Sequence, residues 1–270
     1  MKQLLTLINV KQTVINCLYL LVHLLLFQKY LNMKTIVLAM MILPVSFLHA
    51  QIKEGKITYE QKVDMYRRIP ADNVQIRSMI APTKTSQFEL SFAENQSVFK
   101  SKEEEKDIAD QESNGPKLLI RIGGSPDDVT YKNFSTMKEI DEKELAGTTY
   151  LVEGELNNLT WKLEEGTKNI LGFKCKKATG KTIRGSDVEA WYTEDIQVSS
   201  GPDQFGGLPG MILSLDINKG EIVYTAANLD KKINMKDIKA PIKGKKVSMD
   251  EFMAIQKKEM GNGGMKMVTK

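Results

Sequence analysis

Two neighbouring acids, Glu194 and Asp195, follow directly after an aromatic pair, Trp191 and Tyr192. Paired carboxylates near aromatic rings are typical of glycosidase sites, where a ring stacks on the sugar. Adjacent side chains on a strand point to opposite faces, so these two acids flank one bond only where the chain bends. The pair fits a solvated turn better than a catalytic dyad, and a carbohydrate-directed hydrolase using carboxylates is kept as the alternative function.

A serine nucleophile at Ser199 or Ser200 requires a base, and residues 51–270 contain no histidine. Both histidines, His23 and His49, lie in the first fifty residues. This excludes Ser-His and Cys-His triads, histidine-ligated zinc and imidazole acid–base steps from the rest of the chain. The base would be a lysine, and no spacing selects one. We therefore predict no catalytic residue, no metal site and no cofactor, and expect a non-enzymatic protein.

The most unusual stretch is Phe205–Ile212, which places three glycines and a proline inside an apolar run. Leu208 precedes Pro209 and is therefore pushed toward extended geometry. Pro209 followed by Gly210 predicts a type II turn over Leu208–Met211, which leads into a central strand. No helix pattern and no Lys-Ser or Lys-Thr pair follows, so the stretch is not a phosphate-binding loop.

Side chains in and before this stretch are the candidates for ligand contact: Trp191, Tyr192, Leu208, Pro209 and Met211. By default the two aromatics are a core residue and its outward neighbour on one strand, and a stacking role stays open. The residues assigned to the structural motif are Gly206, Gly207, Gly210, Ile212 and Cys175. Cys175 is the only cysteine after residue 50, so we expect no internal disulfide and a small buried side chain rather than a reactive thiol.

Two apolar runs, residues 14–27 and 36–47, occupy the start of the chain. Each is shorter than the roughly 20 residues that span a bilayer. The second follows a lysine and leads to Ala50, a small residue that suits a cleavage site. We expect residues 33–50 to be a signal peptide and 1–32 to be an extension upstream of the true start, the alternative being a signal anchor or a hairpin of two short membrane segments. No cysteine follows the cleavage point, which argues against a lipoprotein anchor.

Removing this leader changes the charge balance. The chain has 38 basic and 34 acidic residues, and the leader holds four lysines and no acid. The exported part is therefore formally neutral, which argues against a nucleic-acid partner. Seven lysines gather in Lys231–Lys246 with apolar residues between them. They either protect an exposed edge strand from pairing or make a weak contact with an anionic surface.

The remaining pattern is one of short strands separated by turns. Residues 55–65 alternate apolar and polar side chains, which predicts a half-buried strand. No helix of crossover length lies between the strands, which favours an antiparallel meander. Further strands are expected at residues 88–92, 97–99, 118–122, 129–134, 136–140, 148–152, 159–163, 170–178, 188–193, 211–217 and 221–227, the last two as a hairpin.

Three other segments have distinct compositions. The acidic segment 101–116 has too little apolar area for a core, so we expect a mobile loop, and its acids lack the spacing of a calcium loop. Ser248 and Glu251 form a capping box that predicts a helix over about 248–260, with Phe252 on its inner face. Residues 261–270 are expected to be a frayed tail.

These motifs together resemble the GLPGLI family of exported envelope proteins of Gram-negative bacteria. The resemblance rests on residues 55–59, on Ala190–Thr193 and above all on Phe205–Ile212, where Met211 replaces a leucine. It implies a β-rich domain that is exported to the periplasm, the outer membrane or the cell exterior. It implies no activity.

We therefore expect one domain over residues 51–270 that is mainly β. Its sheet is predicted to be a curved antiparallel sheet or incomplete barrel, with the C-terminal helix packed on it. By layout alone, such a sheet is similar to the lipoprotein-carrier type of fold, which wraps an apolar cavity. The expected function is that of a non-enzymatic envelope protein that binds an apolar ligand or another envelope protein.

Overall fold

The computed structural model describes residues 15–16, 18–29, 51–102, 128–156 and 159–260. The chain divides into two compact units, Met1–His49 and Ala50–Lys270. In the first unit, the described residues are helical. Across the described parts of the chain, no helix combines the length and apolar character needed to cross a membrane.

Some of the sequence-based predictions fall on residues that the structure does not describe. These are the signal peptide at 33–50, almost all of the acidic segment, the strand at 118–122 and the tail at 261–270. They stay predictions.

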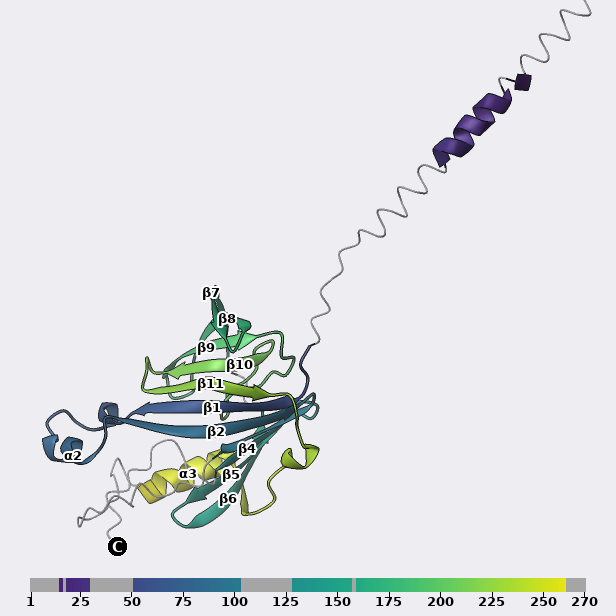
Figure 1. The fold of residues 1–270 in the computed structure, drawn as a ribbon. Coiled ribbons are helices and arrows are strands. Elements are labelled where there is room, and N and C mark those ends of the chain that lie inside the picture. The colour runs from purple at the N-terminus through teal and green to yellow at the C-terminus, as the bar shows by residue number, and fades with distance from the viewer. Residues whose placement is uncertain (1–14, 17, 30–50, 103–127, 157–158, 261–270) are drawn as a thin grey trace, which may run out of the picture. The chain divides into compact units, whose positions relative to one another are not determined.

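In the described part of the second unit, twelve strands form one sheet in the order β12-β6-β5-β4-β3-β2-β1-β11-β10-β9-β8-β7 (Figure 1). Neighbouring strands are antiparallel, except that β12 runs parallel to β6. The sheet curves without closing, so the predicted incomplete barrel is confirmed. The strands are β1 Gly55–Asp64, β2 Thr83–Ala93, β3 Gln96–Ser101, β4 Val129–Asn133, β5 Lys138–Leu145, β6 Thr148–Glu155, β7 Lys162–Ile170, β8 Phe173–Lys181, β9 Asp187–Thr193, β10 Met211–Ile217, β11 Ile222–Asp230 and β12 Lys245–Ser248.

The main core lies on one face of the sheet, which we call the inner face. On β1, Ile57 and Tyr59 point to this face and are fully buried, and Val63 is buried in a smaller cluster with Met65. Leu90 lies opposite Ile57 on β2. The period of two that predicted a half-buried strand thus places the apolar side chains of β1 in the core. Leu213 and Leu215 of β10 are fully buried in the same cluster.

The opposite, outer face carries a second apolar cluster. Ala93, Val98 and Tyr131 are buried there beneath Ile238. Ile238 belongs to residues 231–244, the connection between β11 and β12, which contains the short 3-10 helix η3 Met235–Asp237. We call residues 231–244 the basic strap. Both faces of this part of the sheet are therefore covered.

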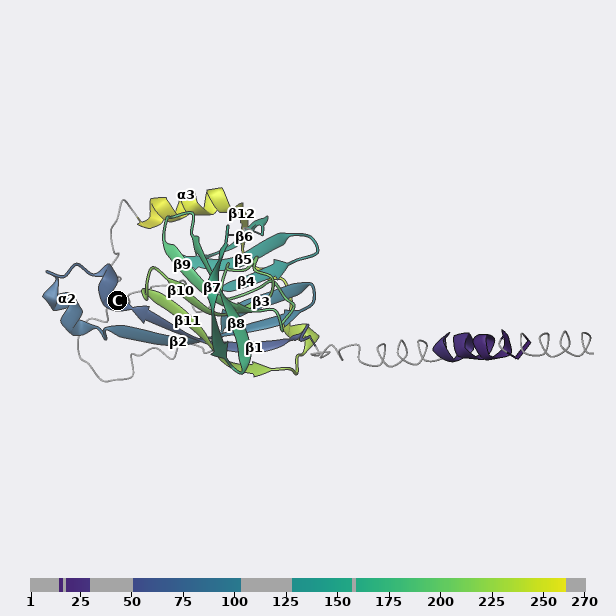
Figure 2. The same cartoon turned by 90° about the horizontal axis from the view of Figure 1, so that it is seen from above.

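Helix α3, Met249–Met260, packs on the sheet as predicted, and it lies on the inner face. Its capping box is present, since the Ser248 N–H donates to Glu251 at 2.8 Å and the Glu251 N–H donates to Ser248 at 3.3 Å. Phe252 is buried and meets the Tyr150 ring of β6 edge-on at 5.6 Å. Arg184, in the β8–β9 turn, donates to Gln256 at 3.3 Å. The helix therefore contacts β6, near one edge of the sheet, and the β8–β9 turn, near the other edge (Figure 2).

Several predicted strand bounds differ from the observed ones, most clearly at β7 and β8. The structure replaces the expected strands at 159–163 and 170–178 with β7 and β8, which are joined by a tight turn at Leu171 and Gly172. Both turn residues have positive φ, 52° and 84°. Gly166 lies where the register of β7 against β8 shifts, as in a β-bulge.

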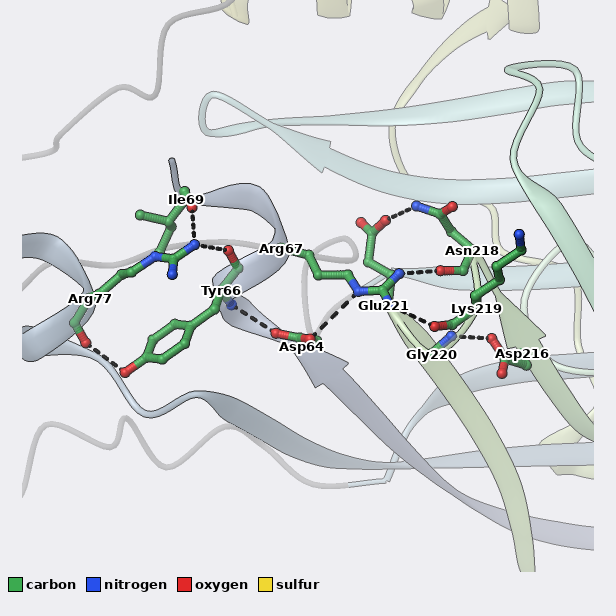
Figure 3. Close-up of polar contacts among 10 residues, drawn as sticks. All are labelled: Asp64, Tyr66, Arg67, Ile69, Arg77, Asp216, Asn218, Lys219, Gly220 and Glu221. Carbon is green, nitrogen blue, oxygen red and sulfur yellow. Dashed lines mark hydrogen bonds and ion pairs between the residues drawn. The ribbon is translucent and has the colours of Figure 1, made fainter. Parts of the chain in front are cut away.

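The segment that connects β1 to β2 is hydrogen-bonded to the β10–β11 turn (Figure 3). It contains the 3-10 helix η1 Met65–Arg68 and the short helix α2 Val74–Met79. Arg67 pairs with Asp64 at 3.6 Å and donates to the carbonyls of Asn218 and Lys219, the latter at 2.7 Å. Arg77 donates to the carbonyl of Ile69 at 2.7 Å.

Candidate functional site

The Phe205–Ile212 stretch forms a corner that leads into β10, an interior strand between β11 and β9. The Gly210 N–H donates to the Leu208 carbonyl at 2.7 Å, the bond of a γ-turn centred on Pro209. The predicted type II turn is therefore wrong, although Gly210 does have positive φ, at 142°. β9 forces this geometry, because a Cβ on Gly210 would lie 2.0 Å from the Thr193 carbonyl oxygen.

Distant side chains hold the backbone of this corner. The Tyr59 hydroxyl donates to the Ile212 carbonyl at 2.6 Å, and the Trp161 indole N–H donates to the Gly206 carbonyl at 2.8 Å. Lys132 Nζ donates to the carbonyls of Asp203 and Phe205, the latter at 2.7 Å. Buried carbonyls need such donors, so the corner acts as a scaffold joined to several strands.

Most of the predicted ligand contacts lie inside the core. Tyr192, Leu208 and Met211 are at most 2% exposed, whereas Pro209 is exposed. Trp191 is half-buried on the outer face, and the ammonium groups of Lys168 and Lys177 each lie 5.8 Å from the centre of its ring. The five residues therefore do not converge on one accessible surface.

The residues that were assigned a structural role lie in buried or conformationally restricted positions. Gly206 is buried, and an added Cβ there would lie 2.8 Å from the Ser199 carbonyl oxygen. Gly207 has positive φ, 83°, and Ile212 is fully buried. Cys175 is a free, buried thiol, and burial raises its pKa to about 11, which disfavours the reactive thiolate.

The acid pair and the serines are not assembled for catalysis. Glu194 accepts a hydrogen bond from Lys176 at 2.7 Å, whereas the Asp195 N–H donates to Thr193 at 3.3 Å. The Ser199 hydroxyl donates to the Leu208 carbonyl at 2.7 Å, and Ser200 is buried 3.0 Å from the Ser97 hydroxyl. These contacts are those of a structured connection between β9 and β10.

A groove of about 640 Å³ lies alongside β7, β8 and β9 and the end of β10. The indole of Trp161 and the side chain of Val188 contribute apolar surface, and Thr160, Thr179 and Lys219 contribute polar groups. The volume lies within the range of small-ligand sites, roughly 300–1,000 Å³. Sequence reasoning missed Trp161; the available signal was that it is one of only two tryptophans.

A second unpredicted feature is a buried charged cluster on the inner face of β4 and β5. Lys132, Glu139 and Asp141 are 2%, 7% and 2% exposed, and Lys143 lies 3.5 Å from Asp141. Within the described residues, one oxygen of Glu139 and one of Asp141 are buried without a hydrogen-bond partner. Among those residues, no three acidic, cysteine or histidine side chains gather as a metal site would require.

Burial sets the protonation of this cluster. It raises the pKa of Glu139 to about 8, against the opposing effect of the Lys132 ammonium. It also raises the pKa of Asp141 and lowers the pKa of Lys132. The cluster therefore places a carboxyl group that titrates near neutral pH inside the protein.

Residues 125–254 match the family model described as the N-terminal domain of the N-glycanase peptide. No curated protein matches the chain. Two solved structures of PNGF-II, in space groups C2 and P21, are 15% and 16% identical, each with a TM-score of 0.49 over 75% of this chain. The chain spans about a third of their length, 32% and 33%.

An uncharacterized conserved protein from Thermus thermophilus is also similar, at 7% identity and a TM-score of 0.38. The alignment covers 73% of this chain and 91% of that protein.

Proposed function

We propose that this chain is an exported, non-enzymatic envelope protein of the GLPGLI type that binds its ligand, or a ligand group on another envelope protein, in the Trp161 groove. The observation that carries this proposal is the groove itself, about 640 Å³ beside an indole ring. The apolar side chains first expected to line a cavity, Leu208 and Met211, are packed in the core. We therefore assign the proposed ligand site to the groove and not to these two residues.

The chemistry of the groove fits a carbohydrate. An indole offers a flat apolar surface for a sugar ring, and Thr160 and Thr179 are polar residues that line the same groove. The groove carboxylates Asp187 and Glu189 are held by Lys181 at 2.9 Å and Lys177 at 2.7 Å, so they define a polar rim. The family match named for an N-glycanase supports a glycan as the ligand.

Titration calorimetry with a free N-linked glycan tests this proposal. Thr160→Arg places a long side chain in the groove and leaves the Trp161 hydrogen bond to Gly206 intact, so we expect affinity to fall by about tenfold or more, on the order of 1.4 kcal/mol. Thr149→Arg is the matched control, because Thr149 is exposed on β6. Equal affinity of the two variants would remove the groove as the site.

The alternative, a carbohydrate-directed hydrolase, is supported by one observation. Glu139 and Asp141 are two residues apart on one face of β5, and each has a buried oxygen without a partner in the described structure. Such a dyad needs access that the present burial does not provide. A nitrophenyl glycoside panel decides between the two functions: hydrolysis by the wild type that disappears in Glu139→Gln would establish the enzyme.

A further inference from the structure

The basic strap is fixed to the outer face of the sheet. Ile238 is only 4% exposed and packs with Val98 and Tyr131. Asp237 lies 3.7 Å from the ammonium of Lys56 on β1, and the Asn234 side chain accepts from the Lys236 N–H at 3.1 Å. The strap therefore presents its remaining side chains from a defined backbone.

Those remaining side chains are basic and apolar. Within the described structure, none of the strap lysines forms an ion pair with a carboxylate, and all are exposed: Lys231, Lys232, Lys236, Lys239 and Lys243. Two apolar side chains of the same strap also face solvent, Met235 at 52% and Ile242 at 85% exposed. Positive charge and exposed apolar area thus share one short segment.

Protection of an edge strand does not account for this arrangement. That interpretation predicts lysines on an unpaired strand, and it holds for Lys245 and Lys246 on the edge strand β12. The five strap lysines lie on no strand. A purely solvated connection would not need to expose Ile242, so the segment has the composition of a contact surface.

We propose that the basic strap docks on an anionic lipid bilayer. The lysines would lie near the headgroup phosphates, where each adds a small, salt-screened attraction, and Ile242 and Met235 would enter the boundary of the acyl region. The exposed apolar side chains favour a bilayer over a soluble polyanion, because a polyanion offers them nothing to bury against. This surface is independent of the Trp161 groove.

Vesicle flotation tests the proposal with protein purified from its own envelope, so that the N-terminus is the natural one. The probes are phosphatidylglycerol–phosphatidylcholine vesicles and pure phosphatidylcholine vesicles. We expect at least about tenfold stronger binding to the anionic vesicles, weakened by high salt. A variant with all five strap lysines changed to glutamine is expected to lose this preference.

The matched control changes five exposed lysines outside the strap and the groove to glutamine: Lys138, Lys168, Lys174, Lys257 and Lys258. It removes the same charge from other parts of the molecule and should keep the preference. Equal loss in both variants would overturn the proposal in favour of net charge alone.

Ile242→Asn, which removes the apolar side chain without changing the charge, separates a bilayer from a soluble polyanion. With all lysines retained, we expect it to weaken vesicle binding severalfold and to leave binding to dextran sulfate unchanged. If the variant binds vesicles as the wild type does, or if the wild type does not float, the strap is not a bilayer-docking surface.

Discussion

Gly210 is the residue on which the corner before β10 depends. Its backbone has positive φ and passes so close to β9 that a Cβ would lie 2.0 Å from the Thr193 carbonyl. An alanine there meets a conformational cost and a backbone clash together. Because the Thr193 carbonyl belongs to an interior strand, the clash cannot be relieved by moving a flexible side chain.

We predict that Gly210→Ala lowers the free energy of unfolding by roughly 3 kcal/mol or more. Urea denaturation measures the change. Gly154→Ala is the control, because nothing lies within 4 Å of an added Cβ at that position on β6. Unfolding of both variants at the same urea concentration would contradict the role given to Gly210.

Glu139 makes stability depend on pH. Its pKa is about 8 in the folded protein, above its ordinary value, so the folded state holds a proton that the unfolded chain releases. This contribution is fully present below the unfolded pKa and is lost as the pH rises through about 8. Burial raises the pKa of Asp141 as well, with the same sign, whereas the lowered pKa of Lys132 acts in the opposite sense.

We predict that Glu139→Gln removes the part of the fall in stability between pH 5 and pH 9 that Glu139 causes, a contribution on the order of 3–5 kcal/mol. Denaturant unfolding at several pH values measures it, and Glu155→Gln, at an exposed position of β6, should keep the wild-type profile. A wild-type stability that does not change over this range would refute the prediction.

Sequence patterns cannot place this cluster, and the reason lies in β5. Glu139 and Asp141 alternate with Ile140, which indicates a strand with the acids in solvent and the isoleucine in the core. The structure has the reverse: Ile140 packs on the outer face, and the acids point to the inner face. Lys132, which lies opposite Glu139 on β4, and Lys143, 3.5 Å from Asp141, place positive charge beside these buried acids.

Among the elements, helix α3 was fully specified by its local sequence. The capping box sets its start, and Phe252 is the buried residue on the predicted face. The β7–β8 turn was not, because Leu171 occupies a positive-φ position that an alanine, leucine or similar side chain rarely adopts. Local sequence predicted α3 because its residues favour a helix in that position. It failed at the β7–β8 turn because the pairing of the two strands imposes a backbone conformation that leucine disfavours.

We predict that Phe252→Ala lowers the free energy of unfolding by about 3 kcal/mol, through loss of its contact with Tyr150 and of buried area. Thermal and denaturant unfolding measure the change. The neighbouring Met253 is 37% exposed, so Met253→Ala should cost much less. Similar costs for the two variants would mean that α3 does not pack on the sheet as described.

At the scale of the whole molecule, strands that are consecutive in the sequence are also neighbours in the sheet, in two separate series. β1 to β6 are successive neighbours, and so are β7 to β11. The meander that turn spacing indicated is therefore correct within each series. The pairing of β1 with β11, which joins the two, has no local signal, because its partners are separated by most of the chain.

We predict that residues 50–270 fold without the preceding segment, since they form a compact unit. The shortened chain should show β-type circular dichroism and one cooperative unfolding transition with the midpoint of the full chain. A broad or absent transition would show that the first fifty residues contribute to the fold.

The β1–β11 pairing has a consequence for the time course of folding. Gln61 of β1 meets Tyr224 of β11 across 163 residues, and Tyr59 of β1 meets Ile212 of the neighbouring β10 across 153 residues, at 2.6 Å in both cases. Closing so large a loop costs chain entropy before any contact forms, which slows folding. During synthesis of the chain, the edge of β1 that pairs with β11 stays unpaired until β11 has been made. We therefore expect newly made molecules to be most prone to aggregation during that interval, and to need a chaperone then rather than later.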